Sequence, residues 1–224
     1  MRVRGINIGL CAVTAVLLLG GCSEARSGTP IATGTSTTAG GSTTETTASG
    51  TSSTPSSTDR YGAPPVTNPL DATRYLEQPC TAIALPLQQS LNLPGQGKPD
   101  TEGAIGSRSP SCRWSNLESV TDGEGTSVAF LKGNKNGLAD LYRQQNSDQR
   151  YKFWEETTVD GYPAVFNGVV DNRSSGGCNL AVGVSDPLAV LVQEQLGGQR
   201  RKENACDRAK QVAAALITTL KRGG

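Results

Sequence analysis

The clearest pattern of apolar and polar positions lies at the end of the chain. Apolar residues recur there at intervals of three and four, the spacing of one helix face: Ala205, Ala209, Val212, Ala213, Leu216 and Leu220. Asn204 precedes this stripe as a suitable N-cap with Asp207 at the third helical position, and Lys221 and Arg222 close it. The pattern predicts an amphipathic helix that packs its stripe on a core.

Period-two alternation upstream of that helix predicts strands. Apolar side chains alternate with small or polar ones over residues 178–184, so we expect a strand that buries one face. An apolar strand is expected over 188–193, after a Ser-Asp-Pro turn. Residues 151–159 and 162–170 flank an Asp-Gly pair, which predicts a hairpin. Pro163 implies that the second hairpin strand is an edge strand or that Pro163 begins it.

The preceding part of the chain carries weaker signals. Residues 112–115 and 126–132 predict two short strands, and apolar residues within 138–142 fall at helical spacing. The first helix is expected to begin near Pro86, whose fixed φ suits a first helical turn, and to stop at residues 93–95, and residues 95–110 are expected to be irregular. Together these elements predict an α+β fold, with a mainly antiparallel sheet of five or six strands flanked by helices.

The N-terminus has the pattern of an export signal. Arg2 and Arg4 precede an apolar run over residues 6–19, which is shorter than the roughly 20 residues that span a bilayer. The Leu-Gly-Gly sequence before Cys22 resembles the lipobox of bacterial prolipoproteins, which implies cleavage there and a lipid on that cysteine. We expect a signal peptide over 1–21 and a lipid anchor at the extracytoplasmic face of the cell membrane. The alternative is an ordinary secretory signal, with Cys22 a chance cysteine.

A segment with almost no large apolar residue follows. Ser, Thr, Gly and Ala dominate residues 23–58, so this segment cannot bury enough apolar surface to offset the entropy lost on ordering. We expect residues 22–69 to form a lipidated, disordered tether, in which the 36 residues 23–58 have a mean reach of about 30 to 36 Å. Sugars on its threonines would stiffen it. Residues 70–224 are then expected to form one domain.

Four cysteines remain inside that domain, and their even number in an exported protein predicts two disulfides. The count alone allows three connectivities. We prefer Cys80 with Cys112 and Cys178 with Cys206, because each bond closes a loop of about 30 residues and contributes roughly 3 to 4 kcal/mol in the chain-entropy model. The second bond would join the final helix to the sheet. Because the chain has no histidine and no Cys-x-x-Cys pair, we expect no metal site and no redox pair.

The residue inventory argues against most enzymes. Without histidine, the commonest general base and the Ser-His-Asp arrangement are missing. Glu155 and Glu156 are adjacent carboxylates, but neighbours on a strand point to opposite faces. Of 21 basic and 20 acidic residues, three and two precede residue 59, which leaves 18 of each and no basic patch for nucleic acid. We expect no enzymatic activity, no cofactor and no nucleic-acid partner.

Several short motifs in a fixed order resemble an uncharacterised family of actinobacterial lipoproteins. They are Gln78-Pro79-Cys80, Cys112-Arg113-Trp114, the Val-Asp-Gly-Tyr-Pro-Ala-Val sequence from Val159, the Gly-Cys-Asn-Leu-Ala-Val sequence from Gly177, and the final helix. The resemblance covers nearly the whole domain and implies an α+β domain whose antiparallel sheet is flanked by helices, similar to the PsbP-like sandwiches of other envelope lipoproteins. It implies no catalytic residue, and only the four cysteines carry over, as disulfide partners.

The remaining hypotheses concern binding. A non-enzymatic binding or accessory module would recognise a protein, a lipid or a glycan, and Trp114 and Trp154 are its candidate surface residues. The loop over 133–137 is either a plain connection or an anion site at a helix N-terminus. The alternatives are a hydrolase or other enzyme without histidine, and a purely structural envelope component. A concave apolar pocket would favour a small ligand, whereas a flat apolar patch would favour a protein partner.

Overall fold

The structure is a computed structural model, and it describes residues 60–94, 96–100, 109–115, 124–198, 200 and 203–223. The predicted signal peptide and Cys22 lie outside these residues. The elements are α1 (Thr73–Glu77), a 3-10 turn (Pro79–Thr81), α2 (Leu85–Ser90), β1 (Lys98–Pro99), β2 (Ser111–Ser115), β3 (Gly125–Phe130), α3 (Leu138–Asp148), β4 (Phe153–Val159), β5 (Tyr162–Gly168), a second 3-10 turn (Arg173–Ser175), β6 (Gly177–Ser185), β7 (Leu188–Gln195) and α4 (Ala205–Gly223). No helix among them is both long and apolar enough to cross a membrane.

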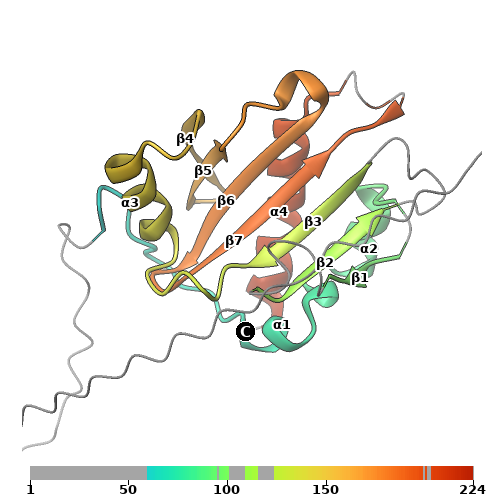
Figure 1. The fold of residues 1–224 in the computed structure, drawn as a ribbon. Helices are drawn as coiled ribbons and strands as arrows, with labels where there is room; N and C mark the ends of the chain where they lie inside the picture. Colours follow the sequence, from blue (N-terminus) through green and yellow to red (C-terminus); the bar gives the residue numbers. More distant parts are fainter. Residues whose placement is uncertain are drawn as a thin grey trace, which may run out of the picture. The chain divides into compact units, whose positions relative to one another are not determined.

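The strands form one sheet in the order β1-β2-β3-β7-β6-β5-β4, shown face-on in Figure 1, and every neighbouring pair is antiparallel. This confirms the predicted α+β fold with an antiparallel sheet flanked by helices. The sheet has seven strands instead of five or six. The additional strand is β1, which has two residues and lies in the stretch predicted to be irregular. A strand of two residues carries no periodic signal.

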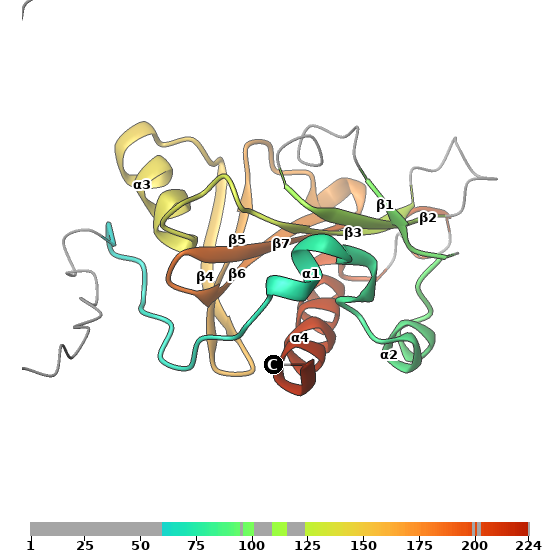
Figure 2. The same cartoon turned by 90° about the horizontal axis from the view of Figure 1, so that it is seen from below.

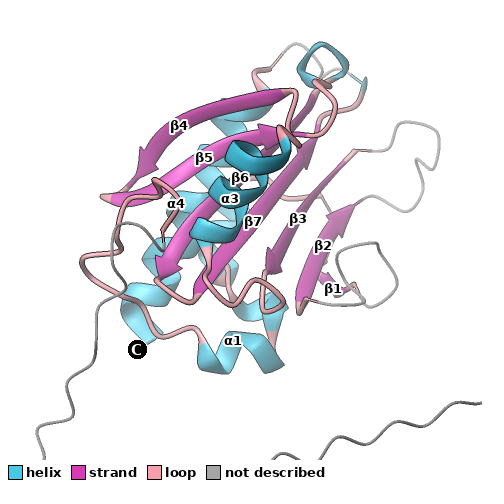
Figure 3. Ribbon diagram, turned by 60° about the vertical axis from the view of Figure 1, so that its left-hand side comes forward, coloured by secondary structure: helices cyan, strands magenta, loops and turns pink. Residues whose placement is uncertain are grey.

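Helices cover both faces of the sheet. Figure 2 shows α3 on one side and α1, α2 and α4 on the other, and Figure 3 shows α3 crossing β5 and β6. The α4 face holds the larger core, which includes Trp114, Phe130 and Leu180. The α3 face holds a smaller one, built around Leu141 and Tyr142. The two cavities and the polar cluster described below lie on the α4 side.

The prediction that β6 buries one face is wrong, because both of its faces are covered. Leu180, Val182 and Val184 pack in the core under α4, whereas Ala181 packs in the core under α3. The period of two is real, but the second set of positions holds small residues that fit beneath a closely packed helix. A small side chain was therefore mistaken for an exposed one.

The hairpin of β4 and β5 is confirmed, with Asp160 and Gly161 at positive φ in its turn. β4 is the edge strand, and β5 pairs on both sides. The prediction for Pro163 is therefore wrong in detail, since Pro163 is the second residue of an inner strand. It is tolerated because the register with β6 begins only at Ala164, so no bond of that ladder is lost.

The final helix is confirmed as predicted. The Asn204 side chain accepts hydrogen bonds from the backbone N–H groups of Cys206 and Asp207, at 2.9 and 3.4 Å, as an N-cap should. The prediction that the first helix lies near Pro86 is wrong, because α1 precedes it. α1 has five residues, too few to show a helical period. Its Tyr75 hydroxyl donates to the Thr219 carbonyl at 3.3 Å, which holds α1 against the end of α4.

Residues 60–69, which the sequence analysis placed in the tether, contact the domain. Arg60 lies 3.7 Å from the carboxylate of Asp186, and the Val66 N–H donates to the same carboxylate at 3.2 Å. The Leu70 N–H donates to the Val184 carbonyl at 2.8 Å. These contacts fix the lead-in along the end of β6, a long-range interaction that local composition does not report.

Candidate functional site

A pocket of about 800 Å³ lies beside α2, and we call it the α2 pocket. Its volume is within the range of about 300 to 1,000 Å³ that is usual for small-molecule sites. Cys80, Thr81 and Gly97 line it together with apolar and amide side chains. The apolar ones are Ile83, Ala84, Leu85 and Leu93, and the amides are Gln88, Gln89, Asn92 and Gln96.

Gln88 holds the wall of this pocket in place. Its Nε2 donates to the Ile83 carbonyl at 2.6 Å, and its Oε1 accepts from Nε1 of Trp114 at 3.1 Å. The N–H of Ala84 donates to the Thr219 hydroxyl of α4 at 3.2 Å. Pro86 lies in the first turn of α2, where its missing N–H costs nothing. These bonds satisfy polar groups that would otherwise be stranded at a short helix.

The Cys80–Cys112 disulfide joins the segment before α2 to strand β2. Gly97 lies against both this bond and Trp114. A Cβ at Gly97 would lie 2.6 Å from Nε1 of Trp114 and 2.8 Å from Sγ of Cys112. Only glycine lets the backbone approach so closely, so this residue closes the pocket against the sheet.

Among the described residues, none that lines the α2 pocket has a charged or an aromatic side chain. An ionised ligand would therefore find no counter-charge there. No group of three metal-ligating side chains occurs among the described residues. The lining offers neutral hydrogen-bonding groups and an apolar floor, which suits reversible binding.

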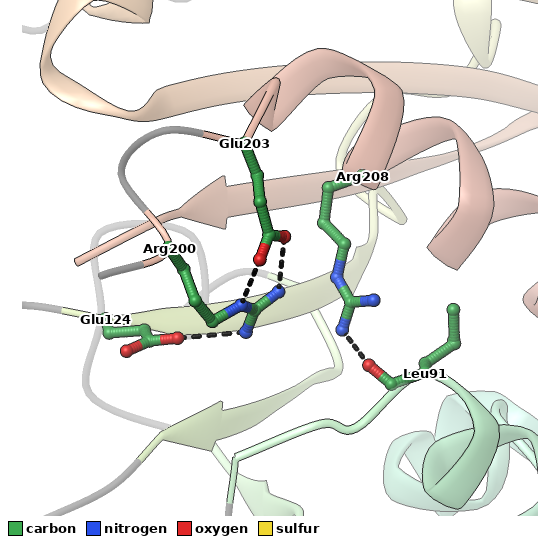
Figure 4. A network of polar contacts seen from close by, with 5 residues as sticks. All are labelled: Leu91, Glu124, Arg200, Glu203 and Arg208. Atoms are coloured by element: carbon green, nitrogen blue, oxygen red, sulfur yellow. Dashed lines mark hydrogen bonds and ion pairs between the residues drawn. The ribbon is translucent and has the colours of Figure 1, made fainter. Parts of the chain in front are cut away.

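A second polar region lies under the first turn of α4, and we call it the α4 polar cluster: Glu124, Glu194, Arg200, Glu203 and Arg208. Figure 4 shows Arg200 between two carboxylates, at 2.9 Å from Glu124 and 3.3 Å from Glu203. Arg208 donates from a terminal nitrogen to the Leu91 carbonyl, the residue at the C-terminal end of α2. The cluster thereby connects α4 to the wall of the α2 pocket.

Glu194 is the buried acid of this cluster, with a residue exposure of 4%. Burial raises its pKa to about 7, although Thr126 and the nearby arginines oppose the rise. Its Oε1 and the Nε of Arg208 have no hydrogen-bond partner among the described residues. Burial lowers the pKa of Arg208. Glu194 and Arg208 thus each keep one buried polar atom without a hydrogen bond, which lowers the stability of the fold.

A smaller cavity of about 500 Å³ lies between β4, β5 and the start of α4. Arg173 lies 3.7 Å above the ring of Phe153 and forms an ion pair of 2.6 Å with Asp171. Hydrogen bonds from Arg173 lower the pKa of Asp171 to about 2. Arg173 is the only basic side chain among the described residues of this lining, and it is already paired and stacked, so the α2 pocket is the better candidate site.

The structure contains both disulfides of the preferred pairing, Cys80–Cys112 and Cys178–Cys206. The second bond joins β6 to α4, as predicted. Trp114, by contrast, is fully buried, so it is not a surface residue. Its neighbours on the α4 face cover the indole, which the strand pattern alone could not indicate.

Trp154 is half-buried in an aromatic group. Its ring centroid lies 5.0 Å from that of Tyr142 and 5.4 Å from that of Tyr151. These contacts make Trp154 a packing residue of the α3 face with part of its surface exposed. Glu155 and Glu156 are both exposed, and they point to opposite faces of β4 as predicted, since Glu155 lines the smaller cavity and Glu156 neighbours Tyr142.

The loop over 133–137 does precede a helix, α3. Its Asn136 donates from the backbone N–H and the side-chain amide to the carboxylate of Asp140, at 3.2 and 3.0 Å. A carboxylate of the protein therefore lies at this N-terminus, and the plain connection is the interpretation that the contacts support.

Sequence reasoning missed both the α2 pocket and Glu194. The pocket is assembled from a short helix, a disulfide and a glycine, none of which carries a periodic pattern. The one available signal was the run of amides among apolar residues, from Gln88 to Gln96. Glu194 lies in an apolar strand at a position paired with Cys178, and a buried acid inside such a strand is itself a signal.

Comparison with known proteins gave one finding. A family model described as "Protein of unknown function (DUF3558)" matches residues 17–219. No curated protein and no solved structure matches the chain. The likeness to PsbP-like sandwiches therefore stays a prediction.

Proposed function

The chain belongs to the DUF3558 family of proteins of unknown function, and from that premise we propose that its domain is a non-enzymatic binding module. The α2 pocket is its ligand site, and the ligand is a small uncharged molecule. The lipid on Cys22 holds the module at the extracytoplasmic face of the cell membrane, as in the actinobacterial lipoproteins that the sequence resembles. The finding that carries the proposal is an uncharged pocket of about 800 Å³.

Two further observations support binding over catalysis. The described residues that line the α2 pocket include no acid and no base, so none of them is suited to proton transfer. Its wall is also held by a disulfide and by both polar ends of Gln88, which keeps the pocket formed without ligand. A site that is formed in advance loses little binding free energy to reorganisation of the protein.

The binding part is tested with Nile red, a neutral apolar dye whose fluorescence rises in apolar surroundings. The mature chain should bind the dye with a blue shift. Gln89→Glu replaces an exposed amide of the pocket with a carboxylate of nearly equal volume, and we expect several-fold weaker binding of the dye. Gln211→Glu on the exposed face of α4 is the matched control and should bind as the parent does. Equal binding by both variants would remove the pocket as the site.

The anchor is tested by intact-mass analysis of protein extracted from membranes. We expect a chain that begins at Cys22 and carries added acyl mass. A chain of the same start without acyl mass would contradict the anchor and leave the binding proposal standing.

A further inference from the structure

The lining of the α2 pocket is graded from apolar to polar. Ile83 is buried at its floor, whereas the amides of Gln89, Asn92 and Gln96 are exposed at its rim. The rim also carries Leu85, whose exposure of 70% makes it one of the most exposed large apolar residues of the described chain. A ligand that matches this gradient has a long apolar part and a neutral hydrogen-bonding end.

The lining also disfavours rings that stack. Sugars and nucleobases are commonly held on aromatic faces, and no aromatic side chain of the described part of the chain lines this pocket. Trp114 is close by, but it is fully buried, and its Nε1 is already bonded to Gln88. The backbone of Gly97, which lines the pocket, lies directly against the Trp114 indole, so that a Cβ at Gly97 would clash with it.

Ionised headgroups are equally disfavoured. A phosphate or carboxylate is held most strongly by a charged donor, and the described lining has no lysine or arginine, only neutral donors such as side-chain amides and one threonine. Amides can satisfy hydroxyl and ester groups, which are uncharged donors and acceptors.

From this gradient we infer that the α2 pocket binds a single acyl chain with an uncharged, hydrogen-bonding headgroup. The acyl chain of this ligand lies on Ile83 and Leu93 and leaves the pocket past Leu85. The ligand's headgroup contacts the rim amides. This inference rests on the proposed function, because it names the ligand class of the same site. A lipid anchor at Cys22 would hold the pocket near a supply of such lipids.

The test uses the mature chain with Cys22→Ser, so that no acyl chain of its own competes. Monooctanoyl, monodecanoyl and monododecanoyl glycerol, each below its micelle concentration, displace bound Nile red. Each added methylene that enters the pocket should tighten Kd by about fourfold, up to the length that fills it. Decanoate, whose headgroup is ionised at pH 8, should bind more weakly than monodecanoyl glycerol.

A rim variant separates an acyl chain from other occupants. Leu85→Asn should weaken monodecanoyl glycerol by about fourfold, the contribution of roughly one methylene contact. Val170→Asn is the matched control, since Val170 has an exposure of 72% and is not among the residues that line the pocket. It should change nothing, and both variants should unfold at the parent's urea concentration.

Three results would overturn the inference. Kd could be independent of chain length, decanoate could bind as tightly as the glycerol ester, or maltotriose could displace the dye where the esters do not. In each case Nile red binding with the Gln89→Glu effect would still support the proposed function. Absence of all binding would remove both proposals.

Discussion

The two disulfides of the domain close loops of similar length in very different surroundings. Cys178–Cys206, with a sequence separation of 28, fastens α4, which has ten buried residues. Cys80–Cys112, with a separation of 32, fastens the segment leading into α2, a helix with no buried residue of its own. In the first case the bond adds to a helix that is itself part of the core. In the second it holds a helix that meets the core through its flank, at Ala82 and Ile83, and through partly buried leucines.

The difference follows from helix length and packing. An isolated helix of six residues is unstable in water, because its nucleation is unfavourable and few bonds follow. Three contacts hold α2: the Cys80–Cys112 disulfide before it, the hydrogen bonds of Gln88 within it, and the bond from Arg208 to the Leu91 carbonyl at its end. α4 has 19 residues and an apolar stripe of its own. A shallow, disulfide-held segment is also where a pocket can stay open.

The largest expected effect is on the α4 side. Leu216→Ala should lower the free energy of unfolding by about 2 to 5 kcal/mol, because Leu216 is fully buried and its loss leaves a cavity. Leu87→Ala in α2 should cost only about 1 kcal/mol, since Leu87 is half-buried at the margin of the core. Urea unfolding followed by far-UV circular dichroism measures both. Equal losses would mean that α2 is as deeply embedded as α4.

Removal of each disulfide should have a similar global effect and a different local one. Cys80→Ala with Cys112→Ala, and Cys178→Ala with Cys206→Ala, should each lower the free energy of unfolding by about 3 to 4 kcal/mol. Hydrogen exchange should then rise selectively over residues 79–93 in the first variant, whereas α4 should stay protected in the second. Loss of protection throughout α4 would show that its packing depends on the bond.

The pH dependence of stability tests the buried acid of the α4 polar cluster. Glu194 has a folded-state pKa of about 7, raised by burial from 4.5. The unfolded chain loses this proton first as pH rises, so the free energy of unfolding should fall by about 3 kcal/mol between pH 4.5 and 7 and then level off. No histidine titrates in that window, because the chain has none. Glu194→Gln should remove the fall.

The control for this measurement is Glu203→Gln in the same cluster. The Glu203 side chain has an exposure of 52%, so its substitution should leave the fall with pH intact. A parent protein whose stability is flat or rises between pH 4.5 and 7 would contradict the buried, protonated state of Glu194.

The smallest expected effect concerns the contact of Gly97 with the disulfide. Gly97→Ala places a methyl group against Trp114 and Cys112 and should cost about 1 to 3 kcal/mol, with a change in indole fluorescence. Gly133→Ala, where a Cβ meets nothing within 4 Å, is the matched control and should be neutral. An unchanged urea midpoint for both variants would mean that the α2 region accommodates the added methyl group without losing stability.

Elements with a strong local period could be predicted from the sequence. α4 has a long stripe and an Asn204 cap, and the β4–β5 hairpin has its Asp-Gly turn, so each carries its own signal. The cysteine pairs followed from loop lengths. The α2 pocket could not be predicted, because it depends on Gly97 reaching Trp114 and on Gln88 bonding in two directions, and neither contact leaves a pattern. The apolar strand predicted over 188–193 ends one residue before Glu194, and the burial of this acid depends on tertiary contacts that local composition does not report.

The disulfide between Cys80 and Cys112 also determines how a mechanical load passes through the molecule. A pull on the N-terminal side enters at Arg60, loosens the bonds of Asp186 and Leu70, and runs along the backbone to Cys80. There the covalent cross-link transfers the tension directly to Cys112 in β2, the second strand from the edge of the sheet. The chain between these cysteines, which contains α2 and Gly97, lies outside the load path. Tension from the N-terminal side would therefore reach the α2 pocket only at Cys80 and bypass the rest of its lining.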